Sequence, residues 1–236
     1  MKKESKNKIL IVTVFAIAMG FLETAVVLYL RKLYYPTGFA FPLKGFIDPA
    51  ILGIEWIREF STIIMLLCLG YFVGKKAYEK FAYFLYAFAI WDIFYYVFLK
   101  AVLNWPESFL TGDILFMVPW PWVGPVITPL LCSLLMIAGA FLIIKFQDEG
   151  RKTYLDLTEW ILLGLGGSLI LYTWLSDYFQ VIISGGFAKD FFTLANNPQL
   201  YNLLSSYIPA NYNWQVYILG ITLSAIAVIK FYSRIK

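Results

Sequence analysis

The sequence predicts an all-α fold: one membrane domain, residues 1–236, built as a bundle of six transmembrane helices with both termini in the cytoplasm. Composition is the first observation, because 61% of the 236 residues are hydrophobic and only 14% are charged, with a mean hydropathy of +0.72. Soluble domains carry about 25% charged residues. The second observation is a series of six apolar runs, each close to the roughly 20 residues that a bilayer-spanning helix needs. We therefore expect a polytopic integral membrane protein.

The six runs cover residues 9–30, 51–73, 81–103, 122–146, 157–182 and 213–233. A basic leader precedes the first run, and Ala16-Ile17-Ala18 resembles the cleavage site of a signal peptide. Because the apolar run continues past that point to Leu30, we interpret it as a retained membrane anchor.

Glycines inside two of the runs predict close contacts between helices, since small residues let helix backbones approach one another. Gly20 has this role in the first run, and Gly164, Gly166 and Gly167 have it in the fifth.

Lysine and arginine are unequally divided between the connecting segments. With the N-terminus inside, the inner segments hold thirteen of these residues and the outer segments hold five. Cytoplasmic loops carry the excess of positive charge in membrane proteins, so both termini are expected in the cytoplasm. The five outer cations are Arg31, Lys32, Lys44, Lys100 and Lys189.

Two outer segments, 31–50 and 183–212, are long and mix glycine and proline with aromatic residues. Such segments either rest on the lipid headgroups as amphipathic connectors or fold over a cavity as a lid. Both interpretations stay open.

Prolines and a glycine lie ahead of the fourth run, in Trp105-Pro106 and in the stretch from Pro121 through Gly124 to Pro125. Regular helix is therefore not expected before about Pro125. The segment is either a bent entry that faces a cavity at membrane depth or a rigid cap above the bilayer. Non-helical backbone survives at membrane depth only where it is buried in protein or lines water.

Ionisable residues inside the apolar runs are the strongest functional signal. Glu55, Arg58 and Glu59 share one face of the second run, because spacings of three and four place side chains on the same side of a helix. Glu23 and Asp92 lie at a similar depth in the first and third runs. Such residues face protein or a wet cavity because lipid exposure is costly. We expect Arg58 to pair with an acid from another run.

Aromatic residues accompany these charges. Trp91, Tyr95 and Tyr96 are expected to line the same site, with the two phenols beside the Asp92 carboxylate. Asp177 in the fifth run is shallower and is expected to be reachable from outside.

The apolar runs hold four acids and one cation, which leaves three uncompensated negative charges; these residues are Glu23, Glu55, Glu59, Asp92 and Arg58. Three functions are compatible with this imbalance. The first is an outward-facing site that binds or transports a small polar or cationic solute. The second is a structural ion network in a scaffold, or in a subunit that joins partner membrane subunits. The third is an enzyme acting on a lipid or isoprenoid, with acids for general acid/base chemistry.

The absence of histidine argues against several common kinds of metal, haem and nucleophilic site. With no histidine at all, the usual haem ligand, the common zinc sites and Ser-His or Cys-His catalysis are excluded. We therefore predict no cofactor, no metal and no nucleic-acid partner, the bilayer being the expected surrounding. Cys68 and Cys132 lie in apolar runs and are interpreted as core residues.

Four segments resemble a family of uncharacterised bacterial multi-pass membrane proteins. They are Arg58-Glu59 with the apolar run that follows, Trp91–Tyr96, Trp105–Ser108 and Pro121–Pro125. The resemblance covers roughly residues 55–130; it implies a bacterial inner membrane and assigns no catalytic residue. Six spans with a covered outer cavity are also similar in layout to the substrate-binding components of vitamin uptake systems.

Overall fold

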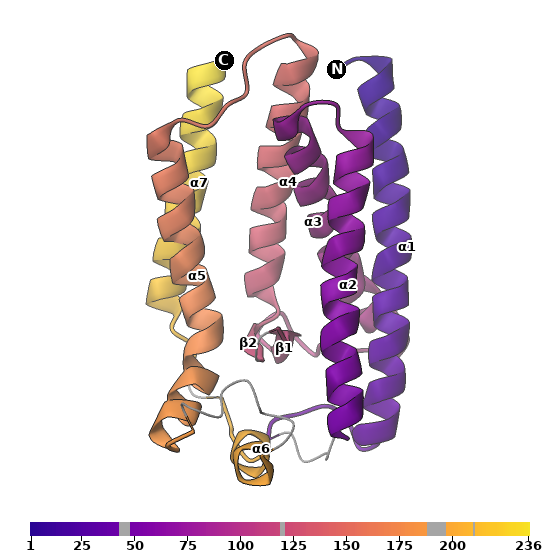
Figure 1. Cartoon of the computed structure of the whole chain (residues 1–236), viewed down its shortest axis with the longest axis vertical. Helices are drawn as coiled ribbons and strands as arrows, with labels where there is room; N and C mark the ends of the chain where they lie inside the picture. The colour runs from indigo at the N-terminus through magenta and orange to yellow at the C-terminus, as the bar shows by residue number, and fades with distance from the viewer. Residues whose placement is uncertain (43–47, 119–120, 188–196, 210) are drawn as a thin grey trace.

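Six long helices run side by side in the computed structural model of the chain (Figure 1). The structure describes residues 1–42, 48–118, 121–187, 197–209 and 211–236, so Lys44 and Lys189 lie outside the described residues. All six are long and apolar enough to cross a membrane. They are α1 (Lys3–Tyr34), α2 (Pro49–Val73), α3 (Ala77–Leu103), α4 (Ile127–Asp148), α5 (Leu157–Ser184) and α7 (Trp214–Ile235). The predicted all-α bundle of six spans is confirmed.

Helix ends follow local capping chemistry. The Asp48 carboxylate accepts the backbone N–H of Ala50 at the start of α2, and the Asn213 side chain accepts that of Val216 at the start of α7. These bonds satisfy backbone donors that have no partner within the helix. The main differences from the predicted runs are that α1 is longer at both ends, which places Arg31 inside the helix, and that α4 begins later than residue 122.

The chain between α3 and α4 forms a β-hairpin. Strands β1 (Gly112–Phe116) and β2 (Trp122–Pro125) pair antiparallel, with Gly112 opposite Pro125. Figure 1 shows the hairpin below α4 and between α2 and α5, both of which continue past it. Gly124 is required here, because a Cβ would lie 2.9 Å from the Trp174 ring on α5. The hairpin thus lies between the helices and not beyond their ends, as expected for a bent entry to the fourth span.

The helices form two groups. Helices α1, α2 and α4 pack on α3, whereas α5 packs on α7 beside them (Figure 1). Close glycine contacts explain part of this grouping: a Cβ on Gly20 would lie 3.0 Å from the Trp91 carbonyl oxygen, and one on Gly166 would lie 2.7 Å from that of Gly220. The predicted contacts at Gly20 and Gly166 are confirmed. Those at Gly164 and Gly167 are wrong, because a Cβ at either position would meet open space.

Two sets of contacts join the α5–α7 pair to the rest of the bundle. Near the termini, the rings of Phe146 on α4 and Tyr232 on α7 stack with centroids 6.1 Å apart. Near the hairpin, the rings of Trp122 and Trp174 stack at 5.9 Å. There the Trp174 indole donates to the Thr128 hydroxyl (2.9 Å). A space remains between these two sets.

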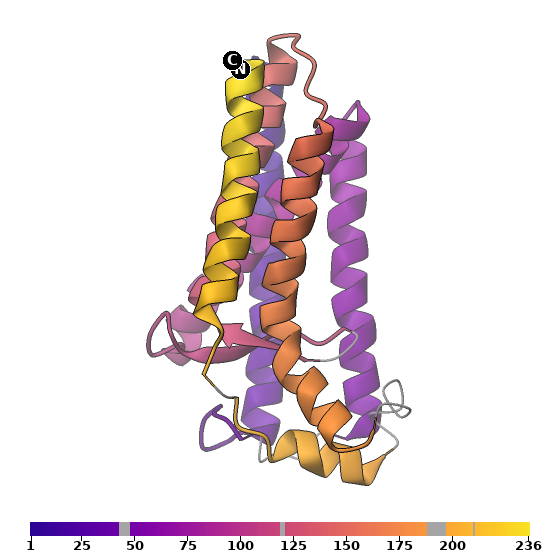
Figure 2. The ribbon, with the colours of Figure 1, turned by 90° about the vertical axis from the view of Figure 1, so that its left-hand side faces the viewer.

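A short helix, α6 (Pro198–Ser205), crosses the end of the bundle opposite the termini (Figure 2). Its Leu200 and Leu204 are buried against Tyr178 and Ile182 of α5 and Leu52 of α2. The segment that contains α6 therefore lies across this end of the bundle, and the choice between a lid and an amphipathic connector stays a prediction. Residues 188–196 of that segment lie outside the described residues.

Replacing Gly166 by leucine is expected to push α5 away from the Gly220 backbone and to lower the stability by about 1–3 kcal/mol, the usual cost of overpacking. The matched control is Gly164→Leu on the same helix, where the new side chain meets open space. Thermal melting of the purified proteins measures the difference. Equal melting of the two variants would show that the α5–α7 contact is not tight.

Candidate functional site

The charged face of α2 points at α1. The Arg58 guanidinium donates hydrogen bonds to Glu23 on α1 and to Glu55 one turn earlier on α2, the latter at 2.8 Å. The Glu59 carboxylate lies 3.9 Å from the same guanidinium. Glu55 and Glu59 are buried. The expected ion pair between Arg58 and an acid of another span is therefore present, and it ties α1 to α2.

Glu59 also holds the hairpin. Its carboxylate accepts a hydrogen bond from the backbone N–H of Met117, directly after β1, at 2.8 Å. An unpaired backbone donor between membrane helices is costly, because hydrocarbon offers it no acceptor. Glu59 supplies that acceptor, so the charged face of α2 fixes the tip of the hairpin.

A second ion pair lies at the other end of β1. The Arg31 guanidinium on α1 lies 3.2 Å from the Asp113 carboxylate, which also accepts a hydrogen bond from the Tyr96 hydroxyl at 3.2 Å. The rings of Phe39 and Trp105 flank the guanidinium at 4.3 and 3.7 Å. Both charged groups are buried. This pair joins α1, α3 and the hairpin.

Sequence reasoning missed this pair. From the sequence, Arg31 is expected among the outer cations, and Asp113 is not expected at the site. A signal did exist, since Asp113 is an isolated acid directly before the apolar residues 114–118. What the sequence does not reveal is that the segment folds back between the helices.

Asp92 is placed differently from the other acids. Its carboxylate accepts a hydrogen bond from the Ser133 hydroxyl on α4 at 2.8 Å. Within the described part of the chain, no cationic group lies within ion-pair distance of it. The neighbouring Trp91 indole N–H is buried and has no hydrogen-bond partner among the described residues. The Asp92 carboxylate thus remains as an acceptor for a ligand.

These side chains surround a chamber of about 110 Å³. Seven charged residues line it, five carboxylates against two guanidiniums, which leaves an excess of three negative charges when all are ionised. The charged residues are Glu23, Arg31, Glu55, Arg58, Glu59, Asp92 and Asp113. We call this space the charged chamber.

A larger cavity of about 670 Å³ adjoins the charged chamber. Both spaces share four lining residues, namely Trp91, Asp92, Leu115 and Phe116. The larger cavity is lined mainly by apolar side chains from α3, α4, α5 and α7, and we call it the apolar cavity.

Three further predicted site residues have different places. Tyr95 lines the charged chamber. Tyr96 differs from expectation, because its hydroxyl donates to Asp113 and not to Asp92. Asp177 on α5 is half-buried and does not belong to the described lining of either space.

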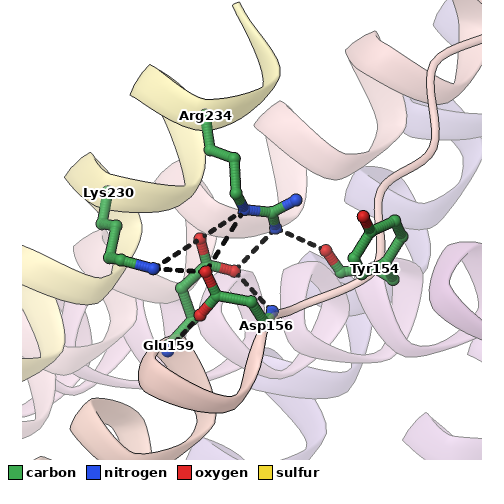
Figure 3. Close-up of polar contacts among 5 residues, drawn as sticks. All are labelled: Tyr154, Asp156, Glu159, Lys230 and Arg234. Atoms are coloured by element: carbon green, nitrogen blue, oxygen red, sulfur yellow. Dashed lines mark hydrogen bonds and ion pairs between the residues drawn. The ribbon is translucent and has the colours of Figure 1, made fainter.

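A separate charged cluster lies at the end of the bundle that carries the termini (Figure 3). Asp156 and Glu159 form a capping box at the start of α5. Arg234 of α7 donates to Glu159 (2.8 Å) and to the Tyr154 carbonyl (2.6 Å), and Lys230 bonds Asp156. Two acids balance two cations, so this cluster fastens α5 to α7 and leaves no free charge.

The hydrogen bond from Lys230 holds the pKa of the Asp156 carboxyl below its usual value. A lowered pKa in the folded state adds stability that is present above the unfolded-state pKa of about 3.9 and is lost as the pH falls through the folded-state value. Asp156→Asn keeps the cap but removes the charge. We expect the variant to melt below the wild type at neutral pH, with the difference shrinking as the pH falls below about 4 and vanishing below the folded-state pKa. A difference that persists in acid would contradict this assignment.

Asp113→Asn is expected to lower the stability by about 3–5 kcal/mol, because it leaves the Arg31 charge buried without a carboxylate. The double variant Arg31→Met, Asp113→Leu removes both charges and should lose less than the single variant. Melting of the two variants beside the wild type measures this coupling. A double variant that is less stable than Asp113→Asn would contradict it.

Comparisons with protein families, with characterised proteins and with solved structures give no match. The resemblance to bacterial multi-pass membrane proteins therefore stays a prediction. The function has to be argued from the geometry of the charged chamber.

Proposed function

We propose that the protein binds a small cationic solute in the charged chamber. The observation that carries the proposal is Asp92, a carboxylate that lines the chamber and has no cationic partner among the described residues. Uncompensated charge between membrane helices is costly. A bound cation would offset that cost.

The walls of the chamber suit an organic cation. Trp91 and Tyr95 line it beside Asp92, and aromatic faces attract ammonium groups. Glu59 on α2 also lines the chamber, with Arg58 at 3.9 Å as its ion-pair partner. The ammonium group would lie between these two carboxylates.

The unequal distribution of lysine and arginine favours an orientation with both termini in the cytoplasm. The chamber would then lie toward the outer half of a bacterial inner membrane, on the side where α6 crosses the end of the bundle. Uptake of the bound solute is the activity this arrangement favours.

A structural role is the second candidate. Arg58 bridges α1 and α2, and Arg31 with Asp113 joins α1 to the hairpin. Ion pairs of this kind hold helices together where lipid gives no hydrophobic drive to associate. The protein would then serve as a scaffold or as a subunit of a larger membrane complex.

Thermal melting of the purified protein in tetramethylammonium chloride, beside sodium chloride at equal ionic strength, tests the binding function. A ligand that binds only the folded state raises the midpoint. We expect tetramethylammonium to raise it, and we expect Asp92→Asn and Glu59→Gln to weaken the apparent affinity by about tenfold, or about 1.4 kcal/mol.

Asp48→Asn is the matched control, because Asp48 lies outside the chamber and asparagine keeps the cap of α2. This variant should show the full shift. If no shift occurs in the wild type, and Asp92→Asn and Glu59→Gln simply melt early, the charges are structural and the scaffold role is favoured.

A further inference from the structure

The apolar cavity, at about 670 Å³, is larger than the charged chamber, and the chamber's small solute alone would not fill it. It lies between the α5–α7 pair and the α3–α4 side of the bundle. The two sets of contacts that join these groups, at Phe146–Tyr232 and at Trp122–Trp174, lie toward its two ends. The cavity is thus an elongated space that runs along the helices.

The lining of this cavity favours an apolar occupant. Most of the side chains that line it are apolar. Examples are Leu85, Phe88, Met136, Ile170 and Phe231. Apolar cavities stay dry and accept apolar guests. A volume of about 670 Å³ falls within the range of roughly 300–1,000 Å³ typical of ligand sites.

One end of the cavity is polar. Asp92 lies there with its hydrogen-bonded partner Ser133, and both line the cavity. Trp91, the residue next to Asp92 on α3, also lines the cavity. Because Trp91 and Asp92 line both spaces, an occupant of the apolar cavity reaches the charged chamber at this point.

We infer that the apolar cavity holds the hydrocarbon chain of a single-chain amphiphile from the membrane, whose amine head lies at Asp92. This inference rests on the proposed function, since the head is the cation that the charged chamber binds. Charge complementarity selects the head: a carboxylate without a cation favours an ammonium group over a phosphate or a carboxylate. The apolar walls select the chain.

Glycines on α5 give a matched pair of variants. Gly167 lines the apolar cavity and Gly164 is exposed on the same helix, and a Cβ on either glycine would meet open space. Gly167→Leu therefore fills part of the cavity, whereas Gly164→Leu adds the same side chain outside it. Both variants are expected to melt close to the wild type.

The test is photolabelling in phosphatidylcholine nanodiscs, which avoids competition from detergent. The probe is a dodecylamine with a diazirine at the end of the chain, and the matching dodecanol is the head-group control. We expect mass spectrometry to locate the label on cavity-lining positions such as Met136 and Leu163, with loss of the label when unmodified dodecylamine is in excess. Gly167→Leu should reduce labelling about tenfold, the scale of mismatch in a hydrophobic pocket, and Gly164→Leu should not.

The head-group assignment predicts that Asp92→Asn weakens labelling by the amine and leaves labelling by the alcohol unchanged. Equal labelling by both probes, unaffected by Asp92→Asn, would overturn the inference by removing the cationic head. Labelling that ignores the competitor and Gly167→Leu would overturn it by removing the chain from the cavity. In that case a midpoint shift with tetramethylammonium that depends on Asp92 would leave the proposed function standing, and its absence would remove both.

Discussion

Peptide groups between membrane helices have no water to bond, and this constraint decides how the hairpin is held. Its two strands satisfy one another through the antiparallel ladder. Around the ladder, the Val126 N–H donates to the Thr111 carbonyl (3.0 Å) and the Ile127 N–H to the Phe109 carbonyl (2.9 Å). The Met117 N–H at the tip bonds Glu59 instead. A buried carboxylate on α2 is thus part of what makes non-helical backbone tolerable here.

The hairpin in turn assembles both spaces of the site. Asp113 brings a carboxylate to Arg31 at one end of β1, while Leu115 and Phe116 form part of the wall shared by the charged chamber and the apolar cavity. A helical fourth span starting at residue 122 would have offered no such wall. The prolines and Gly124 that prevent this helix are therefore as important for the site as the charged residues.

Much of the architecture could be predicted from the chain, because apolar runs and charge placement are local signals. The six spans, the late start of regular helix near Pro125 and the pairing of Arg58 with an acid of another span all follow from such signals. The Arg31–Asp113 pair could not be predicted, since it depends on a hairpin whose partners are set by tertiary packing. The apolar cavity could not be predicted either, because leucines and phenylalanines that line a cavity have the same sequence pattern as those that fill a core. Gly167 illustrates this: its spacing suggested a helix contact, yet it faces open space.

The contacts of Thr128 concern how long a bound molecule would stay in the protein, as well as how tightly it would bind. Its hydroxyl accepts from the Trp174 indole and donates to the Pro125 carbonyl, and its own carbonyl accepts from the Tyr217 hydroxyl at 2.7 Å. One residue of α4 thereby holds α5 and α7 together near the hairpin. A guest held between the helices would leave when such contacts loosen, so these hydrogen bonds of Thr128 would set how long it stays bound, even though Thr128 is absent from the lining of both spaces.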